Sequence, residues 1–126
     1  MQGLLNKFVM LAIRLECDDG DGIFVKREKG FDLGSLLLGD RIIKAHKNFP
    51  TPITEFGDHF TEDHRCAYKS IDQLLQWISL RDLEYLQKFG VVIYQLELDF
   101  CLEGEFQICY LEKNIINKKK ILINGF

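Results

Sequence analysis

The chain has 126 residues, of which 47% are hydrophobic and 12% aromatic. This length suits one domain, since single cores are commonest at roughly 100–150 residues, and the apolar content excludes a predominantly disordered chain. The net charge of −3 and the pI near 5.6 argue against general nucleic-acid binding, for which a basic surface is expected. No apolar run approaches the roughly 18 residues of a membrane span, and Lys7 interrupts the apolar N-terminal segment, so we expect neither a span nor a signal peptide.

The first third of the chain predicts a hairpin followed by a helix. Residues 8–16 are rich in large apolar side chains and predict a strand, and the sequence DDGDG at 18–22 predicts a turn. Residues 23–28 would then form the second strand of the hairpin. The apolar spacing over residues 37–48 predicts a helix that ends before Pro50, and a polar loop is expected from there to residue 64.

Residues 64–94 carry the clearest local signals. Ser70 precedes Gln73 by three residues, which predicts a capping box at the start of a helix. Ser79 predicts the cap of a second helix, and Gly90 suits a left-handed stop at its end. We expect the apolar stripe of these helices, with Trp77 beside it, to lie in the core.

The last third predicts strands. Residues 91–100 alternate between apolar and polar side chains, residues 103–105 predict a turn, and residues 106–112 predict a strand antiparallel to 91–100. The basic tail, residues 113–126, is expected to fray. Together these elements predict a single α+β domain over residues 1–126, in which a mostly antiparallel sheet packs against two or three helices.

The four cysteines lack zinc-ribbon spacing, and we expect Cys101 and Cys109 to be buried free thiols. His59, His64 and Cys66 could hold zinc or form a Cys–His nucleophile pair, but their spacing suits no common metal template. An alignment of DDGDG with a calcium loop puts a cysteine at the first ligand position. We therefore predict a polar loop and an acidic turn at these places, and no metal or cofactor.

Acidic residues gather in clusters along the chain. Such clusters usually form a solvated surface, and less often they bind a basic partner protein. Two of them are candidates for partner binding, namely Asp18, Asp19 and Asp21 in the predicted turn, and Glu55, Asp58, Glu62 and Asp63 in the polar loop.

Arg14 is the odd charge in the first apolar strand. We expect it to face solvent or to pair with Glu16 or Glu97 across the sheet. The alternative is an anchor for a phosphate or carboxylate group, because a guanidinium presents a planar fork of donors.

The order of these motifs resembles that of small phage and prophage proteins of unassigned biochemistry. The resemblance rests on Arg14, Glu16 and the Asp-Gly that follows, on the loop FPTP, and on the C-x-Y-x-S-hydrophobic-x-Q-L-x-x-W pattern at 66–77. It implies a phage accessory role in the host cytoplasm. Since such proteins are often inhibitors of host defence, it further implies a non-enzymatic, anti-CRISPR-like inhibitor. The partner would be a host defence protein such as a CRISPR nuclease, whose basic channel acidic clusters can occupy.

A fainter likeness is to mono-ADP-ribosyltransferases, which also combine an early-strand arginine with a late E-x-E motif. Arg14 and Glu105 match that pattern, and the resemblance implies an enzyme that uses NAD. The usual S-T-S element is missing here, because the corresponding positions read Tyr68-Lys69-Ser70 and Ser70 is explained as a helix cap.

Overall fold

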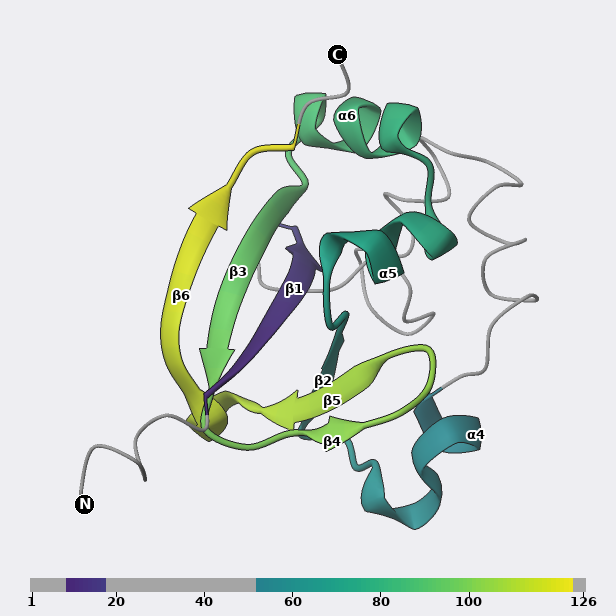
Figure 1. The fold of residues 1–126 in the computed structure, drawn as a ribbon, viewed down its shortest axis with the longest axis vertical. Helices are drawn as coiled ribbons and strands as arrows, with labels where there is room; N and C mark the ends of the chain where they lie inside the picture. The colour runs from purple at the N-terminus through teal and green to yellow at the C-terminus, as the bar shows by residue number, and fades with distance from the viewer. Residues whose placement is uncertain (1–8, 18–51, 124–126) are drawn as a thin grey trace.

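This computed structural model describes residues 9–17 and 52–123 (Figure 1). The predicted second hairpin strand at 23–28 and the predicted helix at 37–48 lie outside the described residues. In chain order the elements are β1 (Met10–Glu16), α4 (Pro52–Phe56), η1 (Gly57–His59), β2 (His64–Ala67), α5 (Ile71–Trp77), α6 (Leu80–Lys88), β3 (Val92–Leu98), β4 (Leu102–Glu103), β5 (Ile108–Leu111), η2 (Glu112–Asn114) and β6 (Ile115–Ile121). The predicted α+β class is confirmed.

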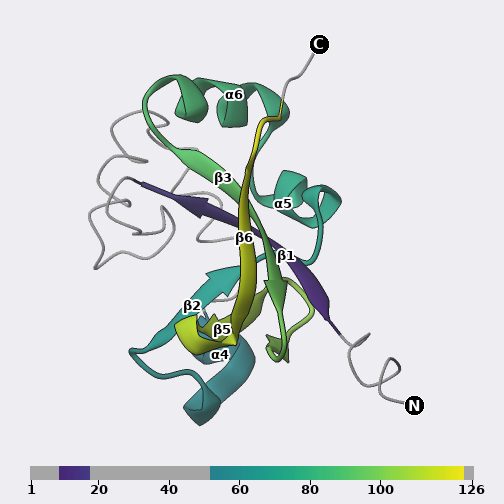
Figure 2. The ribbon, with the colours of Figure 1, turned by 90° about the vertical axis from the view of Figure 1, so that its left-hand side faces the viewer.

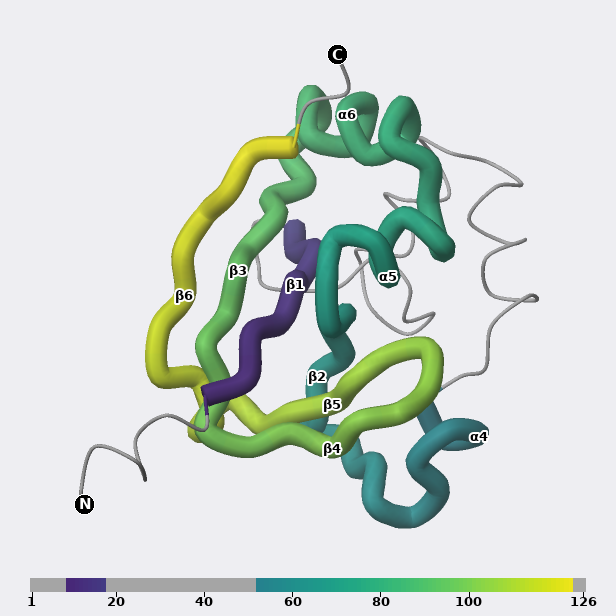
Figure 3. Tube along the Cα trace, in the orientation of Figure 1, coloured from purple at the N-terminus to yellow at the C-terminus, as the bar shows by residue number. Residues whose placement is uncertain are grey.

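The strands form two small antiparallel sheets, with the orders β1-β3-β6 and β2-β5-β4. Among the described residues one isolated backbone bridge joins them, in which Ile13 N–H donates to Tyr68 O (2.7 Å) and Tyr68 N–H donates to Ile13 O (2.8 Å). The predicted pairing of residues 106–112 with residues 91–100 is wrong, because β5 pairs with β2 and β4 instead. Figure 3 traces the chain from β5 of the second sheet through η2 into β6 of the first.

The first sheet has a packed layer on each face because its side chains alternate (Figures 1 and 2). Ile13, Leu15 and Ile93 pack against helices α5 and α6 on one face. Ala12 and Leu96 pack on the other face, against the second sheet. A strand covered on both sides explains why every residue from 12 to 16 is buried.

The predicted helix boundaries are largely confirmed. The Ser70 hydroxyl accepts from Gln73 N–H (3.1 Å), and the Ser79 hydroxyl caps the next helix in the same way. The capping box is modified, since the Gln73 side chain accepts from Lys69 N–H rather than from Ser70. Gly90 ends α6 with φ +101°. Leu74, Leu83, Leu86 and Trp77 are buried as expected, whereas Leu75 and Leu80 are half-buried and Phe89 is exposed.

The polar segments hold more structure than the sequence predicted. The loop expected up to residue 64 contains α4 and η1, and β2 follows at His64–Ala67. The expectation of a frayed tail is wrong for residues 115–121, which form β6 along β3. These elements are short or lack an apolar alternation, so nonlocal pairing decides them rather than local pattern.

Candidate functional site

The first candidate site is a cluster of charges inside the molecule, at β1. Arg14 and Glu16 are 3% and 5% exposed, and both project from the face of the first sheet that is opposite helices α5 and α6. Ionised groups at such depth are stable only when they are paired and hydrogen-bonded. The expectation that Arg14 faces solvent is therefore wrong, and the expectation that it pairs with Glu16 is confirmed.

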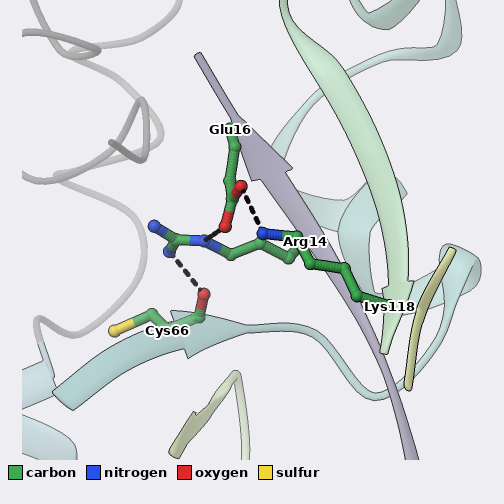
Figure 4. Close-up of polar contacts among 4 residues, drawn as sticks. All are labelled: Arg14, Glu16, Cys66 and Lys118. Atoms are coloured by element: carbon green, nitrogen blue, oxygen red, sulfur yellow. Dashed lines mark hydrogen bonds and ion pairs between the residues drawn. The ribbon is translucent and has the colours of Figure 1, made fainter. Parts of the chain in front are cut away.

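The cluster is built from three strands (Figure 4). Arg14 Nε donates to Glu16 Oε2 (3.3 Å), and Arg14 Nη1 donates to the carbonyl oxygen of Cys66 in β2 (2.8 Å). The other oxygen of Glu16 accepts from Lys118 Nζ of β6 (2.9 Å). Lys118 also lies over the ring of Tyr94, 4.4 Å from its centroid. We call Arg14, Glu16 and Lys118 the charge cluster, in which Arg14 and Glu16 are buried and Lys118 lies at the exposed end.

Two buried phenols lie near this cluster. Burial raises the pKa of Tyr68 and of Tyr110 well above the ordinary value, and the nearby Arg14 guanidinium opposes that shift at both. Neither phenol therefore ionises at neutral pH. The arrangement offers neutral hydroxyls beside a paired guanidinium, which suits a structural tie between the two sheets better than acid–base chemistry.

The second candidate site is the exposed acidic segment, which we define as Asp58, Glu62 and Asp63. Asp58 lies in η1, and the other two lie in the turn before β2. The turn is well organised, since His64 N–H donates to Thr61 O (3.1 Å) and Thr61 N–H donates to His64 Nδ1 (3.0 Å). A surface pocket of about 480 Å³ opens beside it, lined by Glu62, Asp63, Arg65, Leu111, Glu112 and Lys113.

Glu55 was grouped with these acids but has a different environment. Its Oε2 accepts from Phe106 N–H (2.8 Å), and its side chain lies over Gly104, so closely that a Cβ there would collide with it. Its Oε1 is buried without a hydrogen-bond partner among the described residues. Glu55 therefore fastens α4 to the β4–β5 turn and is not displayed outward. Asp18, Asp19 and Asp21 lie outside the described residues.

The His/Cys segment is used for turn structure. The His64 ring stacks on Phe60 and accepts from Thr61, while His59 is exposed at η1. Cys66 lies opposite Cys109 of β5. Within residues 9–17 and 52–123, no three His, Cys, Asp or Glu side chains could hold a metal ion together.

The two residues of the NAD-enzyme alternative have contrasting surroundings. Arg14 is buried in the charge cluster, whereas Glu105 is exposed between β4 and β5. The backbone carbonyl of Glu105 accepts from Gln73 Nε2 (3.2 Å). A guanidinium that recognises NAD would need an open face, and Arg14 is 3% exposed.

Sequence reasoning missed Lys118 and Tyr110. Lys118 stood in the tail that was expected to fray, and Tyr110 was read only as part of a strand. The available signal was the lone Arg14 in an apolar strand, because a buried guanidinium requires hydrogen-bonding partners. That requirement does not say where in the chain the partners are, and Lys118 is 102 residues from Glu16.

Comparison with known proteins gives one family. The family model described as "Bacteriophage T4 Y00F protein" matches residues 10–124, nearly the whole chain. Comparisons with curated proteins and with solved structures give no match. In the part of the chain that the structure describes, no helix has the length and apolar character to cross a membrane.

Proposed function

Because the chain belongs to the Bacteriophage T4 Y00F protein family, and is thus a phage accessory protein, we propose that it inhibits a host defence protein by binding, without catalysis. In this proposal it acts in the host cytoplasm, in the manner of an anti-CRISPR protein. The acidic segment would contact a basic surface such as the nucleic-acid channel of a CRISPR nuclease.

The observation that carries this proposal is the exposure of Asp58, Glu62 and Asp63 on one short ordered segment. Carboxylates held by an organised turn lose little conformational entropy on binding. Complementary charge also accelerates the encounter with a basic partner. Arg65 and Lys113 line the adjoining pocket with the acids, so the surface can distinguish a patterned partner from a uniformly basic one.

The test is a triple reversal of Asp58, Glu62 and Asp63 to Lys, assayed by phage plaque formation on cells that carry an active CRISPR nuclease. We expect the unchanged protein to restore plaques and the triple variant to restore at least about tenfold fewer. With purified proteins the triple variant should bind at least about tenfold more weakly, which corresponds to about 1.4 kcal/mol. Purified partner and inhibitor should also bind more weakly as salt increases.

A matched control reverses Glu84, Glu103 and Glu105, which changes the net charge equally at other places. It should keep full activity. Equal loss in both triple variants would mean that only net charge matters, and full activity in the first would exclude this surface. NAD consumption that disappears in Arg14→Ala and Glu105→Ala would instead establish the enzyme alternative.

A further inference from the structure

The direction of the backbone groups along β1 follows from its bridge to Tyr68. Ile13 uses both its N–H and its carbonyl on Tyr68, so these groups point away from β3. Backbone groups alternate in direction along a strand. Those of Ala12 and Arg14 therefore point toward β3, where the opposite residues are Leu96 and Tyr94.

The same alternation continues across β3 to β6. Since Tyr94 and Leu96 bond to β1, it is Gln95 that points toward β6, where it lies opposite Lys119. The N–H and carbonyl groups of Lys118 and Lys120 consequently point out of the sheet. Among residues 9–17 and 52–123, no hydrogen bond reaches these outward groups.

Within the described part of the chain, β6 is an edge strand of the first sheet. It lies at the outside of the sheet in Figure 1 and runs down the middle of the near side in Figure 2. All five residues from 116 to 120 are exposed. An outer strand edge of this length, with β3 paired only on its inner side, is a template for another extended segment.

The charge of this edge determines which segment fits. Lys118, Lys119 and Lys120 are consecutive, and Lys118 is the one committed to Glu16. Lysines on an edge oppose pairing with a second copy, because like charges would lie opposite each other. An acidic strand meets the reverse situation, with favourable charge pairs on both faces. The lysines thus disfavour pairing with a second copy of this chain and favour pairing with an acidic strand.

We propose that β6 binds an acidic, extended segment of a partner protein by strand addition. The added strand exchanges backbone hydrogen bonds with Lys118 and Lys120. Its acidic side chains lie beside Lys120 on one face of the sheet and beside Lys119 on the other. The exposed side chains of Ile116 and Leu122 supply apolar contact at the two ends. This surface is separate from the acidic segment, and its test does not depend on the proposed inhibitory function.

The probe is a labelled synthetic peptide of seven residues, Val-Thr-Glu-Glu-Glu-Thr-Val, whose three consecutive Glu side chains reach both faces of the added strand. The control peptide has Lys in place of each Glu. We expect the Glu peptide to bind at least tenfold more tightly than the Lys peptide. Lys120→Pro removes an outward N–H that β3 does not use, which an edge strand tolerates. It should abolish binding, whereas Lys120→Ala should reduce binding only several-fold and so isolates the charge.

Amide hydrogen exchange of the unmodified protein tests the geometry even if a proline variant fails to fold. Without peptide, the Lys119 amide should be protected and the amides of Lys118 and Lys120 should exchange freely; saturating peptide should slow both by at least tenfold. The proposal is overturned if the Glu peptide does not bind at 1 mM, or if the Ala and Pro variants bind it equally well. Unchanged amide exchange at Lys118 and Lys120 in the presence of the peptide would also overturn it. Displacement of the peptide by single-stranded DNA, or the formation of dimers through β6, would overturn it as well.

Discussion

At the scale of single residues, Glu16 is the central residue of the charge cluster, because its one carboxylate forms ion pairs with Arg14 of β1 and Lys118 of β6. Glu16→Gln keeps the shape but removes the carboxylate that pairs with the buried guanidinium of Arg14. We expect it to lower the free energy of unfolding by about 3 kcal/mol, as for other broken buried ion pairs. Urea denaturation measures this loss.

The control is Lys118→Gln, which removes the partner whose side chain is 34% exposed. Solvent screens that pair, so the loss should stay at about 1 kcal/mol or less. Equal losses in the two variants would show that Glu16 owes its importance to the lysine rather than to Arg14.

The thiols Cys66 and Cys109 face each other across strands but should differ in reactivity. Cys109 is fully buried, and burial, with Cys101 and Glu55 nearby, raises the pKa of its thiol from 9.0 to about 12. Only the thiolate reacts with alkylating agents. At pH 8 we expect iodoacetamide to modify the partly exposed Cys66 and to spare Cys109 until denaturant is added. Peptide mass spectrometry reads both sites.

The same shift has a consequence for stability against pH. The folded state keeps the Cys109 proton up to about pH 12, whereas the unfolded thiol loses it near pH 9. Deprotonation then favours the unfolded state, so this thiol weakens folding as pH rises above 9. In the iodoacetamide experiment, labelling of Cys109 as fast as Cys66 at pH 8 would contradict the burial of the Cys109 thiol.

At the scale of elements, Gly90 sets the junction between α6 and β3. Its φ of +101° disfavours any residue with a Cβ, although nothing lies within 4 Å of the place a Cβ would occupy. Gly90→Val should therefore cost about 1–2 kcal/mol through the backbone alone, seen as a lower midpoint in thermal unfolding. Gly90→Asn, which tolerates positive φ better, should cost less, and an unchanged midpoint for valine would disprove the strain.

The elements that the sequence predicted are those with local signals. Ser70, Ser79 and Gly90 specify helix ends within a few residues of themselves, and the structure confirms those boundaries. β2 and β6 were missed because their stability comes from distant partner strands. The sequence predicts that β5 pairs with β3, since strands near each other in sequence are usually paired. Instead β5 lies between the short β4 and the distant β2.

At the scale of the whole molecule, the α+β class and the placement of the helices on a sheet followed from composition and periodicity. The division into two sheets did not, because it depends on nonlocal strand pairing, in which β5 pairs with β2 and β6 pairs with β3. The links between the sheets, namely the bridge of Ile13 to Tyr68 and the hydrogen bond from Arg14 to the Cys66 carbonyl, are equally nonlocal. The candidate site was likewise only partly predictable from the sequence. Arg14 was identifiable as an anomaly, but Lys118 completes its surroundings from the far end of the chain.

The joint between the two sheets also holds the chain's single tryptophan. The Trp77 indole donates to the carbonyl of Phe106 in the turn that leads into β5 (3.1 Å) and meets Tyr68 edge-on. An indole in that position is an intrinsic fluorescent reporter, because its emission moves to longer wavelength when water reaches it. The protein thus reports optically on whether its two halves remain together, without any added dye.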